Sequence, residues 1–326
     1  MKRHEQIPLK KLSYYQTGGT YDRLYQPSSV DEAAALIRHL HREKTLFFAL
    51  GSGTNSLVSD DHWPGAVIQF THLTSLSVEK DRVIAGAGVT NSELASFCAE
   101  QGLGGAAWMY RLPGQLGATV RMNARCYGGE ISNIVTKVIA ITPEGEKKIH
   151  PGGQNVFRGY KDTVFMETGE LICEVELKLT SEKSKDEIWQ DMKKFESDRV
   201  SKGQFAFPSR GCVFKNDYSI GVPSGMLLEH AGVKEIQHPL IRVNPQHGNF
   251  VFNLGASSHE ILAFTFQMQE LVWQKFGVWL NYEMEILGDL TDDLRRRVGK
   301  KLANNPRSEQ IKTLRERFEK TIREKA

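Results

Sequence analysis

Two glycine-rich segments constrain this chain more than any other feature of its sequence. The first is Gly51-Ser52-Gly53-Thr54-Asn55-Ser56-Leu57, and the second begins at Leu112-Pro113-Gly114 and continues through Gly117 to Gly128-Gly129. Glycine lets backbone N–H groups approach an anion with no Cβ in the way. Neither segment is a Rossmann fingerprint or a P-loop, because Ser56 stands where a third glycine would be and no lysine follows. Alone, the first segment could equally be a tight turn. Together, the two segments predict a diphosphate-type ligand on a fold that is neither of the Rossmann nor of the P-loop kind.

The composition is that of a globular protein with more than one domain. The chain has 326 residues, of which 40% are apolar and 25% are charged, and its mean hydropathy is -0.39. These values exclude the disordered, collagen-like and membrane-embedded classes. At about 100 to 200 residues per domain, the length favours two or three compact units.

Helix and strand signals alternate along the first half of the chain. Ser29 with Glu32, and Thr90 with Glu93, match the capping box and predict helices over residues 31–42 and 91–101. Short apolar runs at residues 45–50, 66–70 and 82–85 indicate buried strands between them. This alternation predicts an α+β or α/β fold.

A second region follows an expected strand at residues 171–179. The polar residues 180–186 indicate a boundary, and a helix over 188–200 is expected directly after it. Ser257 with Glu260 is a third capping box, which predicts an apolar helix ending near Gly277 and then a strand over 278–287. After Gly288, apolar residues at helical spacing predict two more helices with a break at Pro306.

The last segment differs from the rest in charge. Residues 289–326 contain twelve Lys and Arg and seven Asp and Glu, a net charge of +5, whereas the whole chain carries +3. So small an overall charge does not indicate a nucleic-acid partner. The segment could pack on the preceding domain, self-associate or contact an acidic partner, and a solvated helix is its plainest interpretation.

The cysteines and histidines indicate neither disulfides nor a metal. Cys98, Cys126, Cys173 and Cys212 lie far apart, and the ten histidines form no metal-binding spacing. We interpret Cys98 and Cys173 as small buried hydrophobes and leave Cys126 open. No apolar run approaches the ~20 residues of a membrane span, and no signal peptide is visible. A reducing cytoplasm is therefore expected.

Three polar residues could carry chemistry, although each also has a plain structural interpretation. Cys212 could donate a proton if its loop faces a pocket, but a lone cysteine is more often a buried hydrophobe. Glu283 shares a face of the expected last strand with Glu285, and such pairs more often face solvent. Lys161 could lie in a surface turn.

In this order, the motifs resemble the UDP-N-acetylenolpyruvoylglucosamine reductase (MurB) family over about residues 9–288. The segments that carry the resemblance are T-G-G at 17–19, residues 51–60 and 64–65, A-G-A-G-V at 85–89, residues 112–117, M-N-A at 122–124, Y-G-G-E-I at 127–131, residues 160–165 and 208–216, S-G at 224–225, L-E-H-A-G at 228–232, H-G-N-F at 247–250, Asn253, Glu283 and Gly288. Each motif is modest alone, and their shared order makes the resemblance specific.

The resemblance implies an α+β fold in three parts. We expect a two-subdomain FAD-binding module of the p-cresol methylhydroxylase/vanillyl-alcohol oxidase type at residues 1–182, divided near residue 75. An α+β substrate-binding domain at 183–288 and a charged helical extension at 289–326 would follow. The implied activity is NADPH-dependent, FAD-mediated reduction of UDP-N-acetylglucosamine enolpyruvate to UDP-N-acetylmuramate, for peptidoglycan synthesis in the bacterial cytoplasm. No required protein partner, nucleic acid or membrane insertion is implied.

The resemblance also assigns roles to residues. Hydride would pass from the flavin to C3 of the enolpyruvyl group, with Lys161 and Glu283 stabilising the enolate-like intermediate and Cys212 delivering a proton to C2. Tyr160, Lys215, Asn216 and His247 would bind substrate. The implied FAD-binding residues are Gly51, Ser52, Gly53, Thr54, Asn55, Ser56, Leu57, Pro113, Gly114, Gly117, Ala118, Asn123, Tyr127, Gly128 and Ile131.

Several positions depart from the family pattern. Lys161 stands where arginine is usual, so a planar fork for a carboxylate is replaced by a point charge. Cys212 stands where serine is common, and a thiol is the better acid. Arg111, Arg125 and Ala118 replace usual glycines, so a loop that needs a positive φ must have shifted there. Either arginine could instead pair with the FAD diphosphate.

Two other functions remain alternatives at this point. A flavin oxidase of the same fold superfamily would pass electrons to oxygen without the enolpyruvyl compound. A non-catalytic relative would keep the fold as a binding module, which Arg111, Arg125 and Lys161 suggest.

Overall fold

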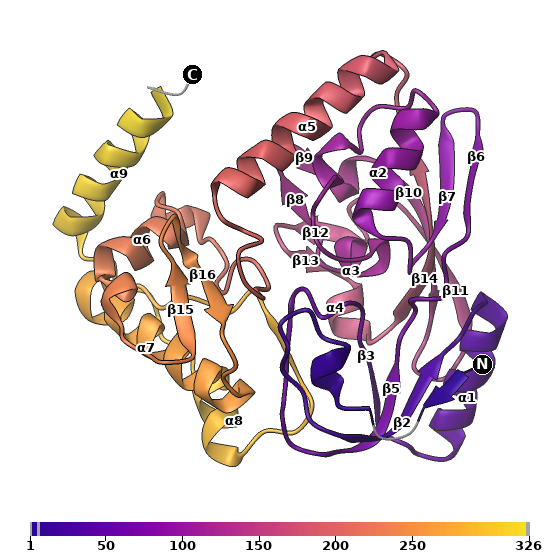
Figure 1. Cartoon of the computed structure of the whole chain (residues 1–326), viewed down its shortest axis with the longest axis horizontal. Coiled ribbons are helices and arrows are strands. Elements are labelled where there is room, and N and C mark those ends of the chain that lie inside the picture. Colours follow the sequence, from indigo (N-terminus) through magenta and orange to yellow (C-terminus); the bar gives the residue numbers. More distant parts are fainter. Residues whose placement is uncertain (1, 5–6, 324–326) are drawn as a thin grey trace. The chain divides into compact units, whose positions relative to one another are not determined.

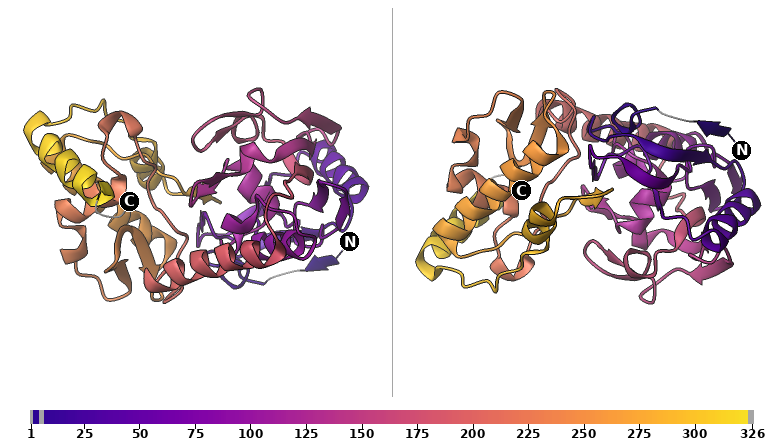
Figure 2. Two further views of the ribbon diagram at one scale, coloured as in Figure 1. Left: turned by 90° about the horizontal axis from the view of Figure 1, so that it is seen from above. Right: turned by 90° about the horizontal axis from the view of Figure 1, so that it is seen from below.

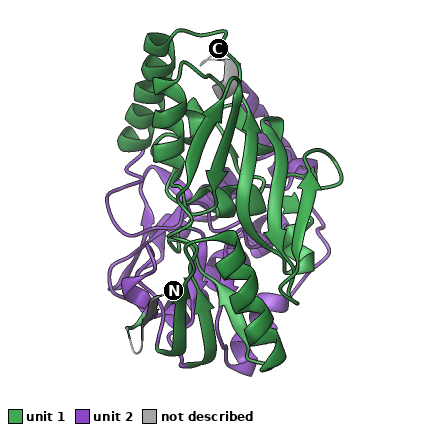
Figure 3. Cartoon of the chain, turned by 90° about the vertical axis from the view of Figure 1, so that its right-hand side faces the viewer, with its two compact units in different colours: residues 1–8, 20–54, 63–201 green, residues 9–19, 55–62, 202–326 purple. Residues whose placement is uncertain are grey.

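The computed structural model describes residues 2–4 and 7–323. The chain forms two compact units, each assembled from separate stretches (Figure 3). Unit 1 comprises residues 1–8, 20–54 and 63–201, and unit 2 comprises residues 9–19, 55–62 and 202–326.

Unit 1 contains two sheets and two short hairpins. The first sheet has the order β1-β2-β5-β3, with β1 antiparallel to β2 and the other pairs parallel. Its strands are β1 Lys2–His4, β2 Tyr21–Gln26, β3 Phe47–Ala49 and β5 Trp63–Ile68. The second sheet is antiparallel throughout, in the order β11-β10-β14-β7-β6. Its strands are β6 Leu76–Glu79, β7 Arg82–Gly86, β10 Val135–Ile141, β11 Lys147–Pro151 and β14 Leu171–Lys178. The hairpins are β8 Arg125–Cys126 with β9 Gly129–Glu130, and β12 Phe157–Gly159 with β13 Asp162–Thr163.

The helices of unit 1 bury the faces that the sequence predicts. They are α1 Val30–Arg42, α2 Asn91–Glu100, α3 Leu116–Arg121, α4 Phe165–Thr168 and α5 Lys185–Ser201. Leu36, Ile37 and Leu40 of α1 are buried, and the reciprocal capping box at Thr90 starts α2 as expected. Cys98 and Cys173 are buried free thiols, which confirms their interpretation as packing residues.

Helix α5 differs from the expectation. We expected this helix after the boundary at residues 182/183, in the substrate-binding domain. In the structure it belongs to unit 1, which continues to Ser201. The reason is packing, because Ile188 and Met192 are buried in the same apolar core as α2 and the second sheet. Figure 1 shows α5 and α2 close together, and Figure 2 shows α5 as one continuous helix.

Unit 2 is built around a long central helix. Its helices are α6 Ser224–Ala231, α7 Ser258–Phe276, α8 Asp292–Gly299 and α9 Ser308–Arg323, and its strands are β4 Ser56–Val58, β15 Ile241–Asn244, β16 His247–Asn253 and β17 Glu285–Leu287. The capping box at Ser257 starts α7, and Gly277 in the left-handed conformation ends it, as predicted. β15 and β16 form an antiparallel hairpin, and β4 pairs in parallel with β17.

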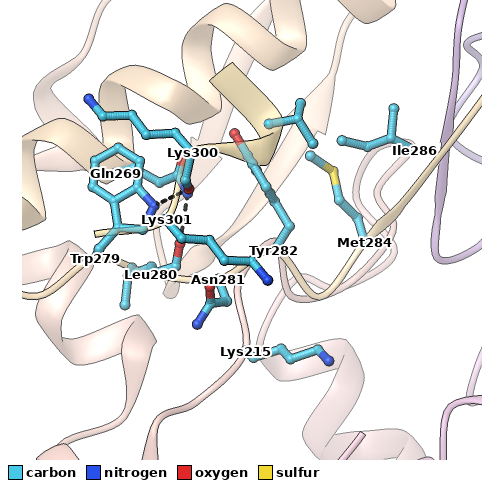
Figure 4. Close-up of a pocket in the computed structure, with 11 residues that line it drawn as sticks. Lys215, Gln269, Trp279, Leu280, Asn281, Tyr282, Met284, Ile286, Lys300 and Lys301 are labelled. Atoms are coloured by element: carbon cyan, nitrogen blue, oxygen red, sulfur yellow. Dashed lines mark hydrogen bonds between the residues drawn. The ribbon is translucent and has the colours of Figure 1, made fainter. Parts of the chain in front are cut away.

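The strand expected over residues 278–287 is shorter in the structure. Only Glu285–Leu287 is a strand. The backbone groups of residues 279–283 bond instead to side chains or to single backbone groups that do not form a continuous ladder. The amide of Gln269 donates to the Leu280 carbonyl at 2.7 Å (Figure 4), and the Trp279 N–H donates to Asn304 Oδ1 at 2.7 Å.

The charged extension packs on unit 2, so the solvated-helix interpretation is wrong. Ile311 and Leu314 of α9 are buried in the apolar core of this unit. Arg315 Nε donates to the Ile220 carbonyl at 2.8 Å, and the N–H of Asn305 bonds to the Gly277 carbonyl. Of the outcomes that we considered, packing on the preceding domain is the one observed.

Two structural features are absent from residues 2–4 and 7–323, the part of the chain that the structure describes. No helix formed by them is long and apolar enough to span a bilayer. No group of three or more His, Cys, Asp or Glu among them is arranged to hold a metal ion.

Candidate functional site

In unit 1, the structure brings the two glycine-rich segments together. A Cβ on Gly114 would lie 2.8 Å from Thr54 Oγ1, and one on Gly51 would lie 2.9 Å from the side-chain oxygen of Gln115. Gly114 also has a φ of +121°, which side chains rarely adopt. The buried amide of Gln69 donates to the Gly51 carbonyl at 3.3 Å and fixes the first loop. Each loop therefore packs a side chain against a glycine of the other loop, where a Cβ would not fit.

The helix that follows the second loop explains two further positions. A Cβ on Gly117 would lie 2.8 Å from that of Ala87, so the glycine allows α3 to pack closely on the end of β7. Ala118 lies within α3 and has no positive φ, so alanine is tolerated there.

The two arginines that replace usual glycines have different surroundings. Arg111 does adopt a positive φ, +59°, and its Nε pairs with Glu196 of α5 at 3.1 Å. Arg125 lies in the extended hairpin strand β8, with its guanidinium 4.3 Å from the centroid of the Tyr160 ring.

Asn123 links the second glycine-rich segment to the turn that carries Lys161. Its φ is +43°, and its Nδ2 donates to Glu130 Oε1 at 2.6 Å and to the Gly159 carbonyl at 2.9 Å. Asn123 is 1% exposed, yet its Oδ1 has no hydrogen-bond partner. An orphaned buried acceptor at this position fits a bound group with N–H or O–H donors, as FAD has.

Tyr127 is held by side chains of α5. Its hydroxyl donates to Asp198 at 2.6 Å, and its ring stacks on Phe195 with 4.6 Å between centroids. Burial and the bond to Asp198 raise the pKa of Tyr127, so it remains a neutral phenol. The neighbouring Gly128 forms the hairpin turn with a positive φ, and Ile131 is buried in the core.

Lys161 lies in a turn, but not at the surface. The residue joins β12 to β13 with a φ of +53° and is only 8% exposed. Its positive charge acts on Cys126: burial raises the pKa of that thiol, and the cations Arg199 and Lys161 oppose the rise. Arg199 Nη2 lies 3.2 Å from Cys126 Sγ. Lys161 therefore lies in a turn, as that interpretation had it, but the turn does not expose the side chain at the surface.

The end of the first glycine segment belongs to unit 2. Asn55, Ser56 and Leu57 were expected to act with Gly51–Thr54 as one loop, but they lead into and form β4. Asn55 Nδ2 donates to the Glu283 carbonyl at 3.1 Å. The Leu57 side chain is buried in the core of unit 2, so it packs there.

In unit 2, Cys212 and Glu283 lie on neighbouring paired segments. The Glu283 N–H donates to the Val213 carbonyl at 2.8 Å, and the Lys215 N–H donates to the Asn281 carbonyl at 2.8 Å. On the other side, Cys212 forms an isolated bridge with Phe250. The segment that carries Cys212 is therefore fixed along both edges.

Asn249 fixes the same segment, although we did not predict it as a site residue. Its Oδ1 accepts from the N–H groups of Val213 at 3.2 Å and Phe214 at 3.0 Å, and its Nδ2 donates to the Phe214 carbonyl at 2.8 Å. The H-G-N-F motif contained this residue, but only the fold reveals its partners.

The remaining predicted substrate residues surround helix α6. Asn216 Oδ1 accepts from the Ser224 N–H at 2.9 Å, at the start of this helix. His247 Nδ1 accepts from the Asn249 N–H at 3.2 Å, which leaves Nε2 as the donor of a neutral ring. Burial lowers the pKa of His247, against the charge of Glu229, and so favours this neutral form.

Arg210, two residues before Cys212, was also missed. It is 3% exposed, and no hydrogen bond of normal geometry reaches its three guanidinium nitrogens. No pattern in the sequence distinguishes it from a surface arginine in a loop.

The fold and the glycine cradle of unit 1 define a flavoprotein. Residues 21–148 match the family model described as an FAD binding domain, and residues 203–287 match the C-terminal domain of UDP-N-acetylenolpyruvoylglucosamine reductase. The two matches have the order that the motifs predicted.

Whole-chain comparisons agree with these matches. The chain is 32% identical to UDP-N-acetylenolpyruvoylglucosamine reductase of Carboxydothermus hydrogenoformans, covering 87% of this chain and 94% of the relative. It is 33% identical to the same-named protein of Treponema denticola, covering 86% and 92%. The solved structure of the Thermus caldophilus reductase superposes with a TM-score of 0.72 at 27% identity, covering 87% of this chain and 98% of that one. The chain belongs to the UDP-N-acetylenolpyruvoylglucosamine reductase family.

Proposed function

We propose that this chain reduces UDP-N-acetylglucosamine enolpyruvate to UDP-N-acetylmuramate, with NADPH as reductant and FAD as cofactor. The observation that carries the proposal is the pairing of the Cys212 segment with Glu283, inside the region that matches the reductase C-terminal domain. We propose the cytoplasm of a peptidoglycan-making bacterium as its location, which the four free cysteines support.

Unit 1 would hold the cofactor. Gly51 and Gly114 would let a diphosphate approach their backbone without a Cβ in the way, and Asn123 Oδ1 would offer an acceptor. When bound, FAD supplies hydride chemistry. We further propose that the two sheets of unit 1 correspond to the two subdomains expected before and after residue 75. The chain passes from the first sheet to the second between Ile68 and Leu76.

The chain's own residues would manage charge and protons in the substrate. Reduction adds a hydride at C3 and a proton at C2, and between these steps negative charge accumulates on the substrate carboxylate. Lys161 would stabilise that charge, with its ammonium held in a largely buried turn. Glu283 would help to position the substrate. Cys212 would deliver the proton to C2 from its thiol.

The test is anaerobic NADPH oxidation by the FAD-loaded chain, with and without the enolpyruvyl substrate. Multiple turnovers only with substrate are expected from the purified chain alone. Rapid reoxidation by oxygen without substrate would instead identify an oxidase, and failure to bind FAD would identify a non-catalytic relative.

A pair of variants tests the proton donor. Cys212→Ala should keep flavin reduction by NADPH and lose turnover of the enolpyruvyl substrate by about 10²-fold or more. Cys212→Ser should retain measurable turnover, because a hydroxyl can also donate a proton. Undiminished turnover by Cys212→Ala would remove the thiol from the mechanism.

A further inference from the structure

The turn that carries Lys161 is a short connection with a strained backbone. It joins Gly159, at the end of β12, to Asp162, at the start of β13, and these two residues pair across the hairpin. Lys161 has a φ of +53°, a left-handed conformation that is costly for any residue with a Cβ. A two-stranded hairpin by itself is marginally stable in water. The conformation of Lys161 therefore needs support from outside the hairpin ladder.

Packing supports this hairpin on one side only. Phe157 of β12 is buried in the core of unit 1, but all three residues of β12 also line a pocket of about 620 Å³. A strand beside a pocket has fewer close-packed neighbours to fix it than a strand inside a core. Polar contacts must therefore hold β12, and Asn123 supplies one of them, to the Gly159 carbonyl at 2.9 Å.

Arg158 supplies more of these polar contacts. Its Nε and Nη2 donate to Asp162 Oδ1 at 3.2 and 2.7 Å, and its Nη2 also donates to the Thr163 carbonyl at 3.2 Å. Its Nη1 donates to Glu167 Oε2 at 2.7 Å. One planar guanidinium therefore joins β12, β13 and α4 across the turn that contains Lys161. A lysine could not make all of these contacts, because an ammonium has no planar fork.

The same contacts engage the carboxylate that follows Lys161 in the chain. The side chain of Asp162 is half exposed, and without Arg158 its charge would attract the Lys161 ammonium toward solvent. With Arg158 in place, both Asp162 and Glu167 have a cationic partner. Lys161 thus remains in its largely buried position, where its charge acts on Cys126.

We propose that Arg158 is a positioning residue for Lys161, because it fixes the place of the Lys161 ammonium by joining β12, β13 and α4. Arg158 would contribute to the reduction without contacting the substrate or the cofactor. This inference rests on the function proposed above, which gives the position of that ammonium its consequence. Since partly exposed ion pairs contribute little to stability, the loss of Arg158 should affect kinetics more than folding.

The two half-reactions of the FAD-loaded full chain separate this role from a general structural one. Arg158→Ala should slow the anaerobic reoxidation of the reduced flavin by the enolpyruvyl substrate about tenfold or more, because a small misplacement of a stabilising group is costly. Flavin reduction by NADPH should stay within about twofold of the wild type. Equal slowing of both half-reactions, or no slowing of either, would overturn the proposal.

A double-mutant cycle tests whether Arg158 acts through Lys161. Lys161→Met should slow the reoxidation about 10²-fold to 10³-fold, because it removes the stabilising charge. If Arg158 acts only through that charge, the double variant should be no slower than Lys161→Met, within about twofold. A loss in the double variant equal to the product of the two single losses would contradict the positioning role.

Arg82→Ala is the matched control. Arg82 is an exposed arginine of the same unit, and its Nη1 donates to Glu176 Oε1 at 2.6 Å, between β7 and β14. Its loss should leave both half-reactions unchanged. Slowing as large as that in Arg158→Ala would show that the loss of any such ion pair has this effect, and would overturn the proposal.

Hydrogen exchange follows the hairpin without any turnover. In Arg158→Ala the backbone amides of residues 157–163 should exchange several-fold faster than in the wild type, and in Arg82→Ala they should not. Unchanged exchange in Arg158→Ala would overturn the proposal even in an active chain. A wild-type chain that never passes hydride to the enolpyruvyl compound would instead refute the proposed function, so the two failures are distinguishable.

Discussion

The guanidinium of Arg210 lies over the ring of Tyr15, 4.7 Å from its centroid, and both side chains are buried. No hydrogen bond of normal geometry reaches the three guanidinium nitrogens or the Tyr15 hydroxyl, although the two groups interact electrostatically with each other. Burial lowers the pKa of Arg210 and raises that of Tyr15. A ring face compensates a buried cation only in part, because the desolvated N–H groups remain without well-placed acceptors.

We therefore predict that Arg210→Met stabilises the chain. Replacing a poorly compensated buried charge by an apolar side chain of similar length should raise the free energy of unfolding by about 1 to 4 kcal/mol, measured by urea denaturation. Arg242→Met is the control, since the exposed Arg242 lies 6.0 Å from the Phe207 ring, and its effect should be within about 0.5 kcal/mol. Destabilisation by Arg210→Met would mean that the contact with Tyr15 outweighs the desolvation.

Gly114→Ala should weaken FAD binding by about tenfold or more. The added Cβ would lie 2.8 Å from Thr54 Oγ1 and would push the two glycine loops apart. The affinity can be measured from the flavin fluorescence on titration. Gly153→Ala is the matched control, because Gly153 also has a positive φ, +115°, but a Cβ added there would meet nothing within 4 Å. Equal losses in both variants would attribute the effect to backbone strain alone.

Arg111→Gly should leave FAD affinity within about twofold of the wild type and raise stability by about 1 kcal/mol. The positive φ of Arg111 is costly for a side chain and free for glycine. The ion pair with Glu196 that is lost is partly exposed and contributes little. Calorimetric FAD titration and thermal unfolding would measure the two effects. A large loss of FAD affinity would show instead that Arg111 contacts the cofactor.

Local signals predicted the elements well, because their causes are local. The boxes at Thr90 and Ser257 start helices through bonds between a side chain and a backbone three residues away. Gly277 ends α7 because it adopts the left-handed conformation itself. Such features can be identified within a few residues of sequence.

The partners of those elements could not be predicted from the same signals. The apolar face of α5 indicates burial but not in which core, and only Ile188 and Met192 packing in unit 1 decides it. Likewise, β4 joins unit 2 through parallel pairing with β17, which is far along the chain. Arg210 has no local signal at all, since its burial depends on Tyr15 in a distant segment.

His247 should make stability depend on pH in the mildly acidic range. Burial lowers its pKa in the folded chain below the ordinary value of about 6.5. As the pH falls below about 6.5, the unfolded chain binds a proton at this histidine before the folded chain does. Because the unfolded state then binds more protons, the free energy of unfolding decreases with falling pH, by at most about 1.4 kcal/mol per pH unit, until the folded pKa is reached.

His247→Gln removes this contribution. The wild type should lose stability relative to the variant between about pH 6.5 and the lowered folded pKa, while the difference between them stays constant above about pH 7.5. Urea denaturation at a series of pH values measures it, with His62→Gln as the control because His62 is an exposed histidine of the same unit. If the stability curves of the wild type and His247→Gln were parallel between about pH 5 and about pH 7, that result would contradict a neutral buried imidazole. That neutral ring is what leaves Nε2–H as a donor for a substrate acceptor, so the same titration bears on the role proposed for His247 in binding.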